Sequence, residues 1–502
     1  MQQWNLVRNL TKLLLRSNAN LLLSVKRVTQ ENRGKDTAGI DGKTATTVRT
    51  RMQLAKQISQ YSLWKASPTL RVFIPKTNGK LRPLGIPTIE DRVAQAIVKN
   101  ALEPYWEAQF EPNSYGFRPG RSCHDAIAHC WIYLNRRGRH KWVLDADISG
   151  AFDNISHAYI LEAVKNFPAR EVVKRWLTAG CVDGGVFHPT SQGTPQGGVI
   201  SPLLANIALN GLQKALVGKV GFVRYADDFV VTARTREEIE INLPIIEKWL
   251  AVRGLQLHPE KTSIRPMDEG FNFLGFHLRH YRGVCLIMPQ KEKVLEFLQS
   301  IRSWLKSNKQ IEAAAVIGRL NPKITGWANY YKGVVSKETF SYVKNQIWQQ
   351  IWRWCLRRHA RKRRTWVKKK YFTIYGGKDW VFSTHTFSKD GHRKLIHLKD
   401  ISETPIKRHI KVKGTASPDD PLLKEYWEKR RYARTVSVLR ERRLDLIAAN
   451  QRWRCPQCSL FLTDDFDLPD SVILTIEWKP NDGRNVLMHS ECVIRSGVRT
   501  GA

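Results

Sequence analysis

The first third of the chain changes from a helical to a strand-like hydrophobic pattern and back. Residues 1–35 repeat apolar positions at helical spacing up to the turn-rich stretch GKDTAGIDGKT, which predicts one or two amphipathic helices. From about residue 70 the period shortens, and LRVFIPKTNGKLRPLGIP predicts two strands joined at Asn78 and Gly79, a pair typical of tight hairpins. A helix is expected at about 89–110, and its apolar face holds Val93, Ile97 and Ala101.

The next segment alternates short apolar runs with glycine-rich loops. The stretch SYGFRPGRSCHDAI predicts a loop that runs into a helix, and HKWVLDADISGAFDNISH predicts a strand that ends in a turn. SQGTPQGGVISPLLANIALNGL predicts a glycine-rich loop before a helix, and GFVRYADDFVVTAR predicts a β-hairpin with two adjacent aspartates at its tip. Strands and helices alternate irregularly, so this half is expected to be α+β with a mixed or antiparallel sheet.

From about 290 to 362 the pattern becomes helical. One face carries a stripe of Ile347, Trp348, Ile351, Trp352 and Cys355, and another face carries Arg353, Arg357, Arg358 and Arg361. Ordinary helix packing is the simpler interpretation of the two tryptophans. The run RRHARKRRTWVKKK then breaks the pattern, as a basic linker or arm would, and residues 371–450 carry weaker signals.

Charge is the unusual feature of the composition. Lys and Arg outnumber Asp and Glu by 82 to 45, which leaves a net charge of +37. A polyanionic partner is the simplest way to relieve that self-repulsion, although a protein bound to a ribosome or to a membrane surface would share it. The 17 tryptophans favour nucleic acid, because aromatic faces stack on bases while cations follow phosphates.

The sequence carries no apolar run that approaches the roughly 20 residues needed to span a bilayer, so no membrane partner is expected. The amphipathic, acid-poor N-terminus also fits an organelle presequence, but its apolar period continues smoothly into the adjoining segment, which favours a cytoplasmic, bacterial protein. Five scattered cysteines are expected to be reduced, buried thiols, namely Cys123, Cys130, Cys181, Cys285 and Cys355.

Three aspartates form a candidate metal site. Asp227 and Asp228 stand within an apolar run, and taken alone they are typical of a polar hairpin tip. Asp147 supplies a third carboxylate at the end of an apolar strand. An antiparallel sheet brings a strand-end aspartate and a hairpin-tip pair together, and two Mg²⁺ ions about 3.5–4 Å apart need several such oxygen ligands. The sequence therefore predicts a two-metal phosphoryl-transfer site.

Several sequence blocks then follow one another in order: RPLGIPTIEDRVAQ, SYGFRPGRS, DISGAFDN, GTPQGGVISPLLANI, YADD and LHPEKT. Together they resemble the blocks of a reverse transcriptase of the group II intron type. The stretch LTKLLLRSNANLLLSVKRVTQENRGKDTAGIDG is similar to the N-terminal extension of that family, and GWANYYKG with the basic helix after it resembles its maturase (X) domain. The resemblance implies a right-hand polymerase, with fingers and palm on an antiparallel sheet, then an α-helical thumb and X domain.

The resemblance also implies roles for the polymerase residues. Asp147, Asp227 and Asp228 would be catalytic and would bind two Mg²⁺ ions. Phe152 would pack against the sugar of the incoming nucleotide and exclude a 2′-hydroxyl.

Other residues would contact the substrates. Lys76 and Arg82 would hold the triphosphate, as cations do in phosphoryl transfer. Gln196 would touch the templating pair, and Lys261 would lie near the leaving phosphate as a proton donor. The aromatic pair Phe273 and Phe276 would either pack in the core or help to grip the primer.

Domain boundaries follow from the same resemblance. They are an N-terminal extension at 1–70, fingers and palm at 71–285, a thumb and X domain at 286–366, a basic DNA-binding region at 367–450 and a degenerate HNH endonuclease-like tail at 451–502. In the X domain, Arg353, Arg357, Arg358 and Arg361 would bind intron RNA and help it to reach its splicing-active fold.

The tail departs from the family pattern. Many members end in an HNH nuclease, and Pro480, Asn485, His489 and Cys492 fit its outline. However, Glu477 and Trp478 stand where a histidine is expected, and Val493 occupies the place of the closing histidine. Hydrolysis then has no evident general base, so DNA endonuclease activity is expected to be lost. A structural Zn²⁺ in a small zinc-binding-like module is expected at Cys455, Cys458, Cys492 and His489, with plain thiols as the alternative.

These features predict a multifunctional enzyme, an RNA-directed DNA polymerase that is also a maturase. Its partners would be its group II intron RNA, an RNA template with a DNA primer, target DNA and dNTPs. Without a nuclease, it would promote intron mobility through nascent strands at replication forks. One alternative is a splicing-only RNA-binding factor, which does not need the aspartates, Phe152 and the PQG loop together. Another is a reverse transcriptase used for defence or diversity generation, which would lack the X domain and the nuclease-like tail.

Overall fold

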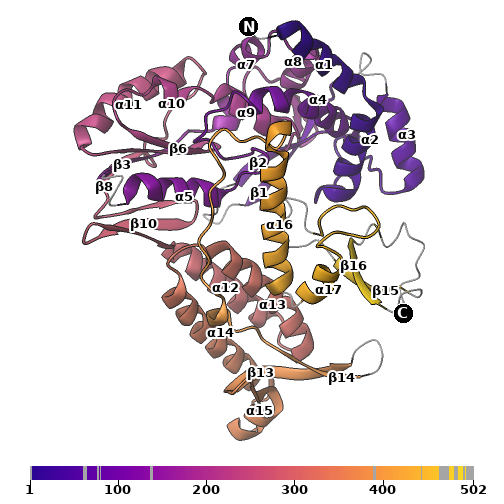
Figure 1. The fold of residues 1–502 in the computed structure, drawn as a ribbon, viewed down its shortest axis with the longest axis vertical. Coiled ribbons are helices and arrows are strands. Elements are labelled where there is room, and N and C mark those ends of the chain that lie inside the picture. The colour runs from indigo at the N-terminus through magenta and orange to yellow at the C-terminus, as the bar shows by residue number, and fades with distance from the viewer. Residues whose placement is uncertain are drawn as a thin grey trace. The chain divides into compact units, whose positions relative to one another are not determined.

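The computed structural model describes residues 3–59, 65–75, 79, 81–135, 140–387, 392–441, 444–462, 474–479, 484–489 and 492. The chain is mixed α+β and forms two compact units (Figure 1). Unit 1 comprises Met1–Pro266 with Val412–Asp420, and unit 2 comprises Met267–Lys411 with Pro421–Ala502. Within the described ranges, no helix is long and apolar enough to cross a membrane.

Unit 1 begins with helices that the apolar period predicted. α1 (Trp4–Arg16) and α2 (Asn18–Lys26) confirm the prediction for residues 1–35, and α3 (Val48–Ile58) follows. α4 (Ile89–Glu107) confirms the next helix, and Val93, Ile97 and Ala101 are buried as expected. Asn20 on α2 donates from Nδ2 to the carbonyl of Ile97 at 3.1 Å, which fixes α2 against α4.

A four-stranded sheet contains the predicted hairpin. β1 (Thr69–Pro75) pairs antiparallel with β2 (Leu81–Ile86), and Asn78 of the expected turn lies outside the described residues. The short β4 (Cys181–Asp183) joins the other edge of β1 in parallel, and β5 (Val186–His188) completes the order β2-β1-β4-β5.

A second sheet forms the centre of unit 1, with the order β6-β7-β3-β8 and all pairs antiparallel. Its strands are β6 (Gly221–Tyr225), β7 (Asp228–Ala233), β3 (Trp142–Asp147) and β8 (Ser263–Pro266). Phe229, Val230 and Val231 of β7 are fully buried, because apolar side chains of the covering helices pack on the sheet. The other helices of the unit are α5 (Cys123–Leu134), α6 (Ala151–Asn154), α7 (His157–Ala163), α8 (Arg170–Thr178), α9 (Ser201–Ala208), α10 (Leu212–Ala215) and α11 (Arg236–Ala251).

The segment 412–420 lies far along the chain but belongs to unit 1. Its backbone binds residues of the SYGFRPGRSCHD loop and helix. Arg121 donates from Nη2 to the carbonyl of Gly414 at 2.6 Å, and the amide of Val412 donates to Asp125 Oδ1 at 2.8 Å. These buried polar contacts fix the segment, which the sequence pattern had not indicated.

Unit 2 opens with a three-stranded antiparallel sheet and continues with long helices. The strands are β9 (Phe271–Phe273), β10 (Phe276–Tyr281) and β11 (Val284–Pro289), and Phe273 and Phe276 are buried, as the core interpretation of these aromatics requires. The helices α12 (Lys291–Ser307), α13 (Ala313–Tyr331) and α14 (Lys337–Arg358) confirm the helical pattern expected from 290 to 362. On α14, Trp348 and Trp352 pack against Trp380 with ring centroids 5.7 and 5.2 Å apart, which favours the packing interpretation.

The basic run after α14 is not simply a linker. Its second half forms α15 (Arg364–Tyr371), because Val367 and Tyr371 are one helical turn apart and both are buried. Residues 371–450 carried only weak signals in the sequence, whereas the structure has a three-stranded sheet and several helical segments there. They are β12 (Phe372–Tyr375), β13 (Lys378–Phe387), β14 (Arg393–His397), η3 (Ile401–Glu403), η4 (Pro421–Leu423), α16 (Lys424–Glu441) and α17 (Asp445–Asn450). The tail adds the antiparallel pair β15 (Leu474–Lys479) and β16 (Arg484–His489).

Candidate active site

The three predicted carboxylates lie together at one end of the central sheet. Asp147 is the last residue of β3, Asp228 is the first residue of β7, and the antiparallel register pairs them directly. Asp227 lies in the turn between β6 and β7, next to Asp228 in the chain. Residues opposite each other on antiparallel strands have Cβ atoms about 4.5–5.5 Å apart, which is within reach of shared cations.

The turn that carries Asp227 is stabilised by residues packed against its backbone. Ala226 has a φ of +59°, a conformation that costs a non-glycine residue roughly 1 kcal/mol. Arg224, which is fully buried, donates from Nη1 to the carbonyl of Ala226 at 3.0 Å and to Asn206 Oδ1 at 3.0 Å. Gly116 leaves room for the turn, since a Cβ there would lie 2.3 Å from the Ala226 nitrogen.

Electrostatics at this end of the sheet favour a cation. Burial, followed by the charge of Asp227 and the hydrogen bond and charge of Asp147, raises the pKa of Asp228 to about 8. Burial also raises the pKa of Asp227, with Asp147 adding to the shift while Arg82 and Lys261 oppose it. Adjacent carboxylates that resist ionisation together are typical of sites where divalent cations offset the repulsion. The hard oxygen ligands present fit Mg²⁺.

Lys261 lies beside the carboxylates. Its Nζ donates to Asp147 Oδ2 at 2.5 Å, and that hydrogen bond is the main reason that the pKa of Lys261 is raised. The amide of His258 donates to the carbonyl of Asp147 at 2.8 Å, which fixes the LHPEKT loop next to the end of β3. Lys261 therefore carries its proton close to the aspartates.

Phe152 and Gln196 lie at a pocket in unit 1, and Arg82 contacts Gln196. Phe152 and Gln196 line it together with Gly85. Arg82 donates from Nε to Gln196 Oε1 at 2.8 Å. Gly197, with a φ of +126°, lets the loop approach β2, because a Cβ there would lie 2.7 Å from the carbonyl of Gly85. Lys76 lies outside the described residues.

Some residues at this site were not anticipated. Arg224 could have been suspected, because a charge inside the apolar run GFVRYA needs a partner. Asp145 stands two residues before Asp147, and burial raises its pKa to about 6. Phe117 has a φ of +59° and meets the ring of Phe152 edge to face at 6.0 Å between centroids. No pattern in the sequence reveals that contact.

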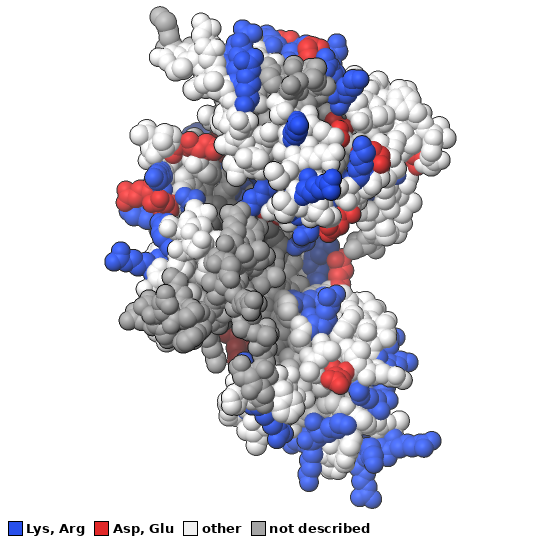
Figure 2. Space-filling model, turned by 90° about the vertical axis from the view of Figure 1, so that its right-hand side faces the viewer, with Lys and Arg blue, Asp and Glu red and all other residues white. Residues whose placement is uncertain are grey.

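The arginines of the helical region differ in their surroundings. Arg353, Arg357 and Arg361 are exposed, whereas Arg358 is partly buried, donates to the carbonyl of Ile311 and lies over the ring of Trp354. Figure 2 shows Lys and Arg side chains gathered at its lower end, the end that α15 occupies in Figure 1.

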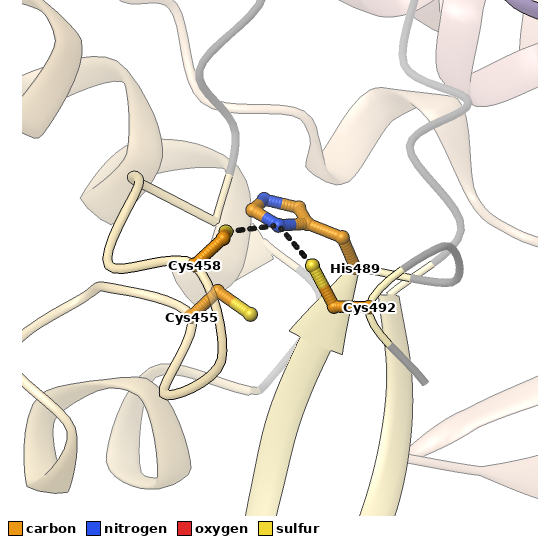
Figure 3. A group of neighbouring side chains, drawn as sticks. All are labelled: Cys455, Cys458, His489 and Cys492. Carbon is orange, nitrogen blue, oxygen red and sulfur yellow. Dashed lines mark hydrogen bonds between the residues drawn. The ribbon is translucent and has the colours of Figure 1, made fainter. Parts of the chain in front are cut away.

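The tail brings four potential metal ligands together. The ligand atoms of Cys455, Cys458, His489 and Cys492 all lie within 4.8 Å of one another (Figure 3). His489 is the last residue of β16, and its Nε2 donates to the carbonyl of Phe461 at 2.9 Å. Because a carbonyl only accepts, Nδ1 is left with its lone pair facing Cys458 and Cys492, at 3.4 and 3.8 Å.

These four side chains fit a tetrahedral zinc ion. Three thiols and one imidazole are a common structural ligand set, and bonds of about 2.0–2.3 Å would require only small movements of the side chains. The nuclease-like positions cannot be compared in the same way. Pro480 and Val493 lie outside the described residues, and of Glu477, Trp478 and Asn485 only the backbone, in β15 and β16, is described.

Comparisons with known proteins found family models that match three parts of the chain. The family model "Reverse transcriptase (RNA-dependent DNA polymerase)" matches residues 74–278, "Group II intron, maturase-specific domain" matches 294–372, and "N-terminal domain of reverse transcriptase" matches 1–58. Protein YkfC of Escherichia coli is 36% identical, over 57% of this chain and 88% of its own length. The group II intron-encoded protein LtrA of Lactococcus lactis is 38% identical, over 60% of this chain and 66% of its own length.

Proposed function

Because the chain belongs to the family of group II intron reverse transcriptases with a maturase domain, we propose that it is both an RNA-directed DNA polymerase and a maturase. Its nucleic-acid partners would be its own intron RNA, an RNA template with a DNA primer, and target DNA. The observation that carries the polymerase proposal is the pairing of Asp147 with Asp228 beside Asp227, at the end of a buried antiparallel sheet. We also propose a right-hand polymerase architecture, with the domain boundaries expected from the sequence. The protein would act in the bacterial cytoplasm.

Asp147, Asp227 and Asp228 would hold two Mg²⁺ ions. When bound, such ions activate a primer 3′-hydroxyl and neutralise the leaving pyrophosphate. The chain's own part is positioning. The antiparallel register fixes Asp147 opposite Asp228, and Arg224 fixes the turn that carries Asp227.

The surrounding side chains would select and hold the nucleotide. Phe152, buried and braced by Phe117, presents a rigid ring at the pocket, where it would exclude a 2′-hydroxyl. Arg82 would hold the triphosphate together with Lys76. Gln196, which Arg82 contacts, would touch the templating pair, and Lys261 would donate a proton to the leaving phosphate.

The maturase activity would rest on RNA binding by unit 2. Exposed Arg353, Arg357 and Arg361 would contact phosphates, with a steep dependence on salt. The bound intron would thereby be held in its splicing-active fold, while the protein itself cuts nothing during splicing.

For the tail we propose a structural Zn²⁺ held by Cys455, Cys458, His489 and Cys492, in a module that has lost nuclease activity. The ion would link the loop after α17 to the end of β16, where a small core of Ala448, Leu462 and Leu487 packs. Intron mobility would then depend on primers supplied by nascent strands at replication forks. Purified protein should release about one zinc per chain when its thiols are blocked, and a failure to detect zinc would contradict the proposal.

The main test is primer extension on an RNA template with Mg²⁺, together with splicing of the intron that flanks the reading frame. The comparison is between the intact protein and a variant with Asp227→Ala and Asp228→Ala. We expect extension to vanish in the variant and splicing to survive. An intact protein that splices but never extends a primer would instead be a splicing-only factor, and one that extends primers but neither binds nor splices the intron would have another role.

A further inference from the structure

The short segment 412–420 belongs to unit 1, although the chain on both sides of it belongs to unit 2. This segment is called the strap below. It lies beyond residue 372, where the last range matched by a family model ends. Val412 and Ala416 of the strap are buried, whereas Thr415 is exposed. One side of the strap is therefore packed into unit 1, and the other side faces the solvent.

Arg121 joins the strap to the loop at residues 112–121, which is called the brace loop. The side chain of Arg121 is buried, and its Nη1 donates to the carbonyl of Pro112 at 3.2 Å. Its Nη2 donates to the carbonyls of Gly414 and Ala416 at 2.6 and 3.3 Å, so the strap supplies two of the three acceptors found among the described residues. A buried guanidinium without its acceptors is costly, so the position of Arg121 depends on the strap.

A second buried arginine carries this support into the brace loop. Arg118 donates from Nη1 to the carbonyls of Glu111 and Ser114, at 2.7 and 2.8 Å. Its Nε and Nη2 bind the Glu107 carboxylate at 2.8 and 2.7 Å, and Oε1 of the same carboxylate lies 3.6 Å from Arg121 Nε. One buried carboxylate thus holds both arginines, and a displacement of Arg121 would reach the backbone of the loop through Arg118.

The brace loop has its other support at the active-site turn. The amide of Tyr115 donates to the carbonyl of Arg224, and the amide of Arg224 donates to the carbonyl of Asn113, both at 2.9 Å. Gly116 lies so close to the backbone of Ala226 that a side chain would not fit between them. The loop is therefore held by β6 on one side and by the arginines, and through them the strap, on the other.

Phe117 stands between these two supports. Its φ of +59° is a conformation that a residue other than glycine keeps only where its surroundings hold it. The ring of Phe117 meets Phe152 edge to face at 6.0 Å between centroids, and Phe152 lines the pocket of unit 1. A ring that excludes a 2′-hydroxyl must stay in place, because a misplacement of about 1 Å can change a rate by about a hundredfold.

We propose that the strap is a positioning element of the polymerase site, which holds Phe152 in place through Arg121, the brace loop and Phe117. The inference rests on the proposed polymerase function and deepens it, because it adds residues that determine how well dNTPs are distinguished from rNTPs. It also makes nucleotide selection depend on a segment that lies far along the chain from the polymerase blocks.

The test uses full-length protein with graded changes at Gly414. A Cβ there would lie 3.2 Å from the Cβ of Pro112, which is tighter than an ordinary contact. Gly414→Ala should therefore press on the brace loop slightly, and Gly414→Val should press on it harder. Thr415→Val, at the neighbouring exposed position of the strap, is the matched control. Circular dichroism and thermal unfolding check that the variants keep the fold.

The measurement is primer extension on an RNA template with dNTPs and with rNTPs, expressed as the ratio of kcat/KM for the two. This ratio does not depend on the fraction of active protein, so a variant that is only less well folded leaves it unchanged. We expect the preference for dNTPs to fall about threefold in Gly414→Ala and at least about tenfold in Gly414→Val. Thr415→Val should keep the intact preference.

A double-mutant cycle tests the route through the loop. Phe117→Ala removes the ring that braces Phe152 and should itself lower the preference for dNTPs, so adding Gly414→Val should change it little further. An unchanged preference in both Gly414 variants, or fully additive effects with Phe117→Ala, would overturn the inference and leave the polymerase proposal standing. An intact protein that extends no primer would refute the polymerase proposal itself, and the inference with it.

Discussion

Replacing Asp228 with asparagine should stabilise the metal-free protein while abolishing polymerase activity. Burial and three neighbouring carboxylates raise the pKa of Asp228 to about 8 in the folded state, against 3.8 as its ordinary value. A carboxyl whose folded pKa is raised contributes most stability below its unfolded pKa, and that contribution is lost as pH rises through the folded pKa. The window of loss is therefore about pH 4 to 8, and the asparagine amide of the variant would not titrate in it.

The magnitude follows from the width of that window. At pH 7 the solution is about three pH units above the pKa of Asp228 in the unfolded chain, and each unit is worth about 1.4 kcal/mol. The destabilisation of the folded state by this carboxyl therefore has an upper bound of about 4 kcal/mol. Because the pKa of the adjacent Asp227 is also raised, Asp228 does not carry the whole effect, and we expect Asp228→Asn to raise the free energy of unfolding by about 2–4 kcal/mol at pH 7. The difference should fall to about 1 kcal/mol near pH 5.

Urea unfolding in EDTA, followed by tryptophan fluorescence and circular dichroism at pH 5, 6 and 7, measures this difference. Asp36→Asn, at an exposed position of unit 1, is the matched control and should leave the midpoint unchanged. Excess Mg²⁺ should narrow the gap by stabilising only the intact site. If Asp228→Asn is no more stable than the intact protein at pH 7, or if the gap does not depend on pH, the carboxylates do not repel each other as argued.

The remaining predictions concern the supports of the two sites. Arg224→Met should leave the Ala226 carbonyl without its buried donor. We therefore expect kcat for primer extension to fall at least about tenfold, with KM for dNTP little changed. A variant with intact kcat would show that the turn keeps its conformation without Arg224. Cys455→Ser should abolish zinc binding, measured by metal analysis, while primer extension persists; full zinc content would exclude Cys455 as a ligand. Arg358→Gln should lower the free energy of unfolding by about 1–3 kcal/mol and leave the salt dependence of RNA binding unchanged. Arg357→Gln should make the salt dependence of RNA binding less steep and leave stability unchanged. Equal behaviour of the two variants would refute the distinction between these arginines.

Local patterns in the sequence were sufficient where one element determines the outcome. The apolar period located α4 and the helices from α12 to α14, and the alternating runs located β1, β2, β6 and β7. The spacing of the two cysteines in CPQC indicated a metal site, because a two-residue gap suits one ion. These signals need no tertiary information, because buried positions recur along the sequence with the period of the helix or the strand.

Other features depended on contacts between distant residues. The direct pairing of Asp147 with Asp228 needs the register of two strands about 80 residues apart, which the sequence could suggest but not fix. Arg358 and Arg357 are neighbours in the chain, yet one donates to a backbone carbonyl and the other lines a groove. Arg302 of α12 and Arg357 of α14 line that groove together only because the two helices pack side by side, so their proximity was not visible in either helix alone.

The sequence by itself thus determined the chemistry available to this protein: three carboxylates, a basic helical region and four zinc-type ligands, all in recognisable local patterns. The tertiary structure decided which groups act together. It set Asp147 against Asp228, placed Arg224 beneath their turn, and gathered His489 with three cysteines up to 34 positions away. The reason is physical, since side-chain identity is a property of single residues, whereas charge repulsion, burial and ligand geometry arise only between residues that folding brings close.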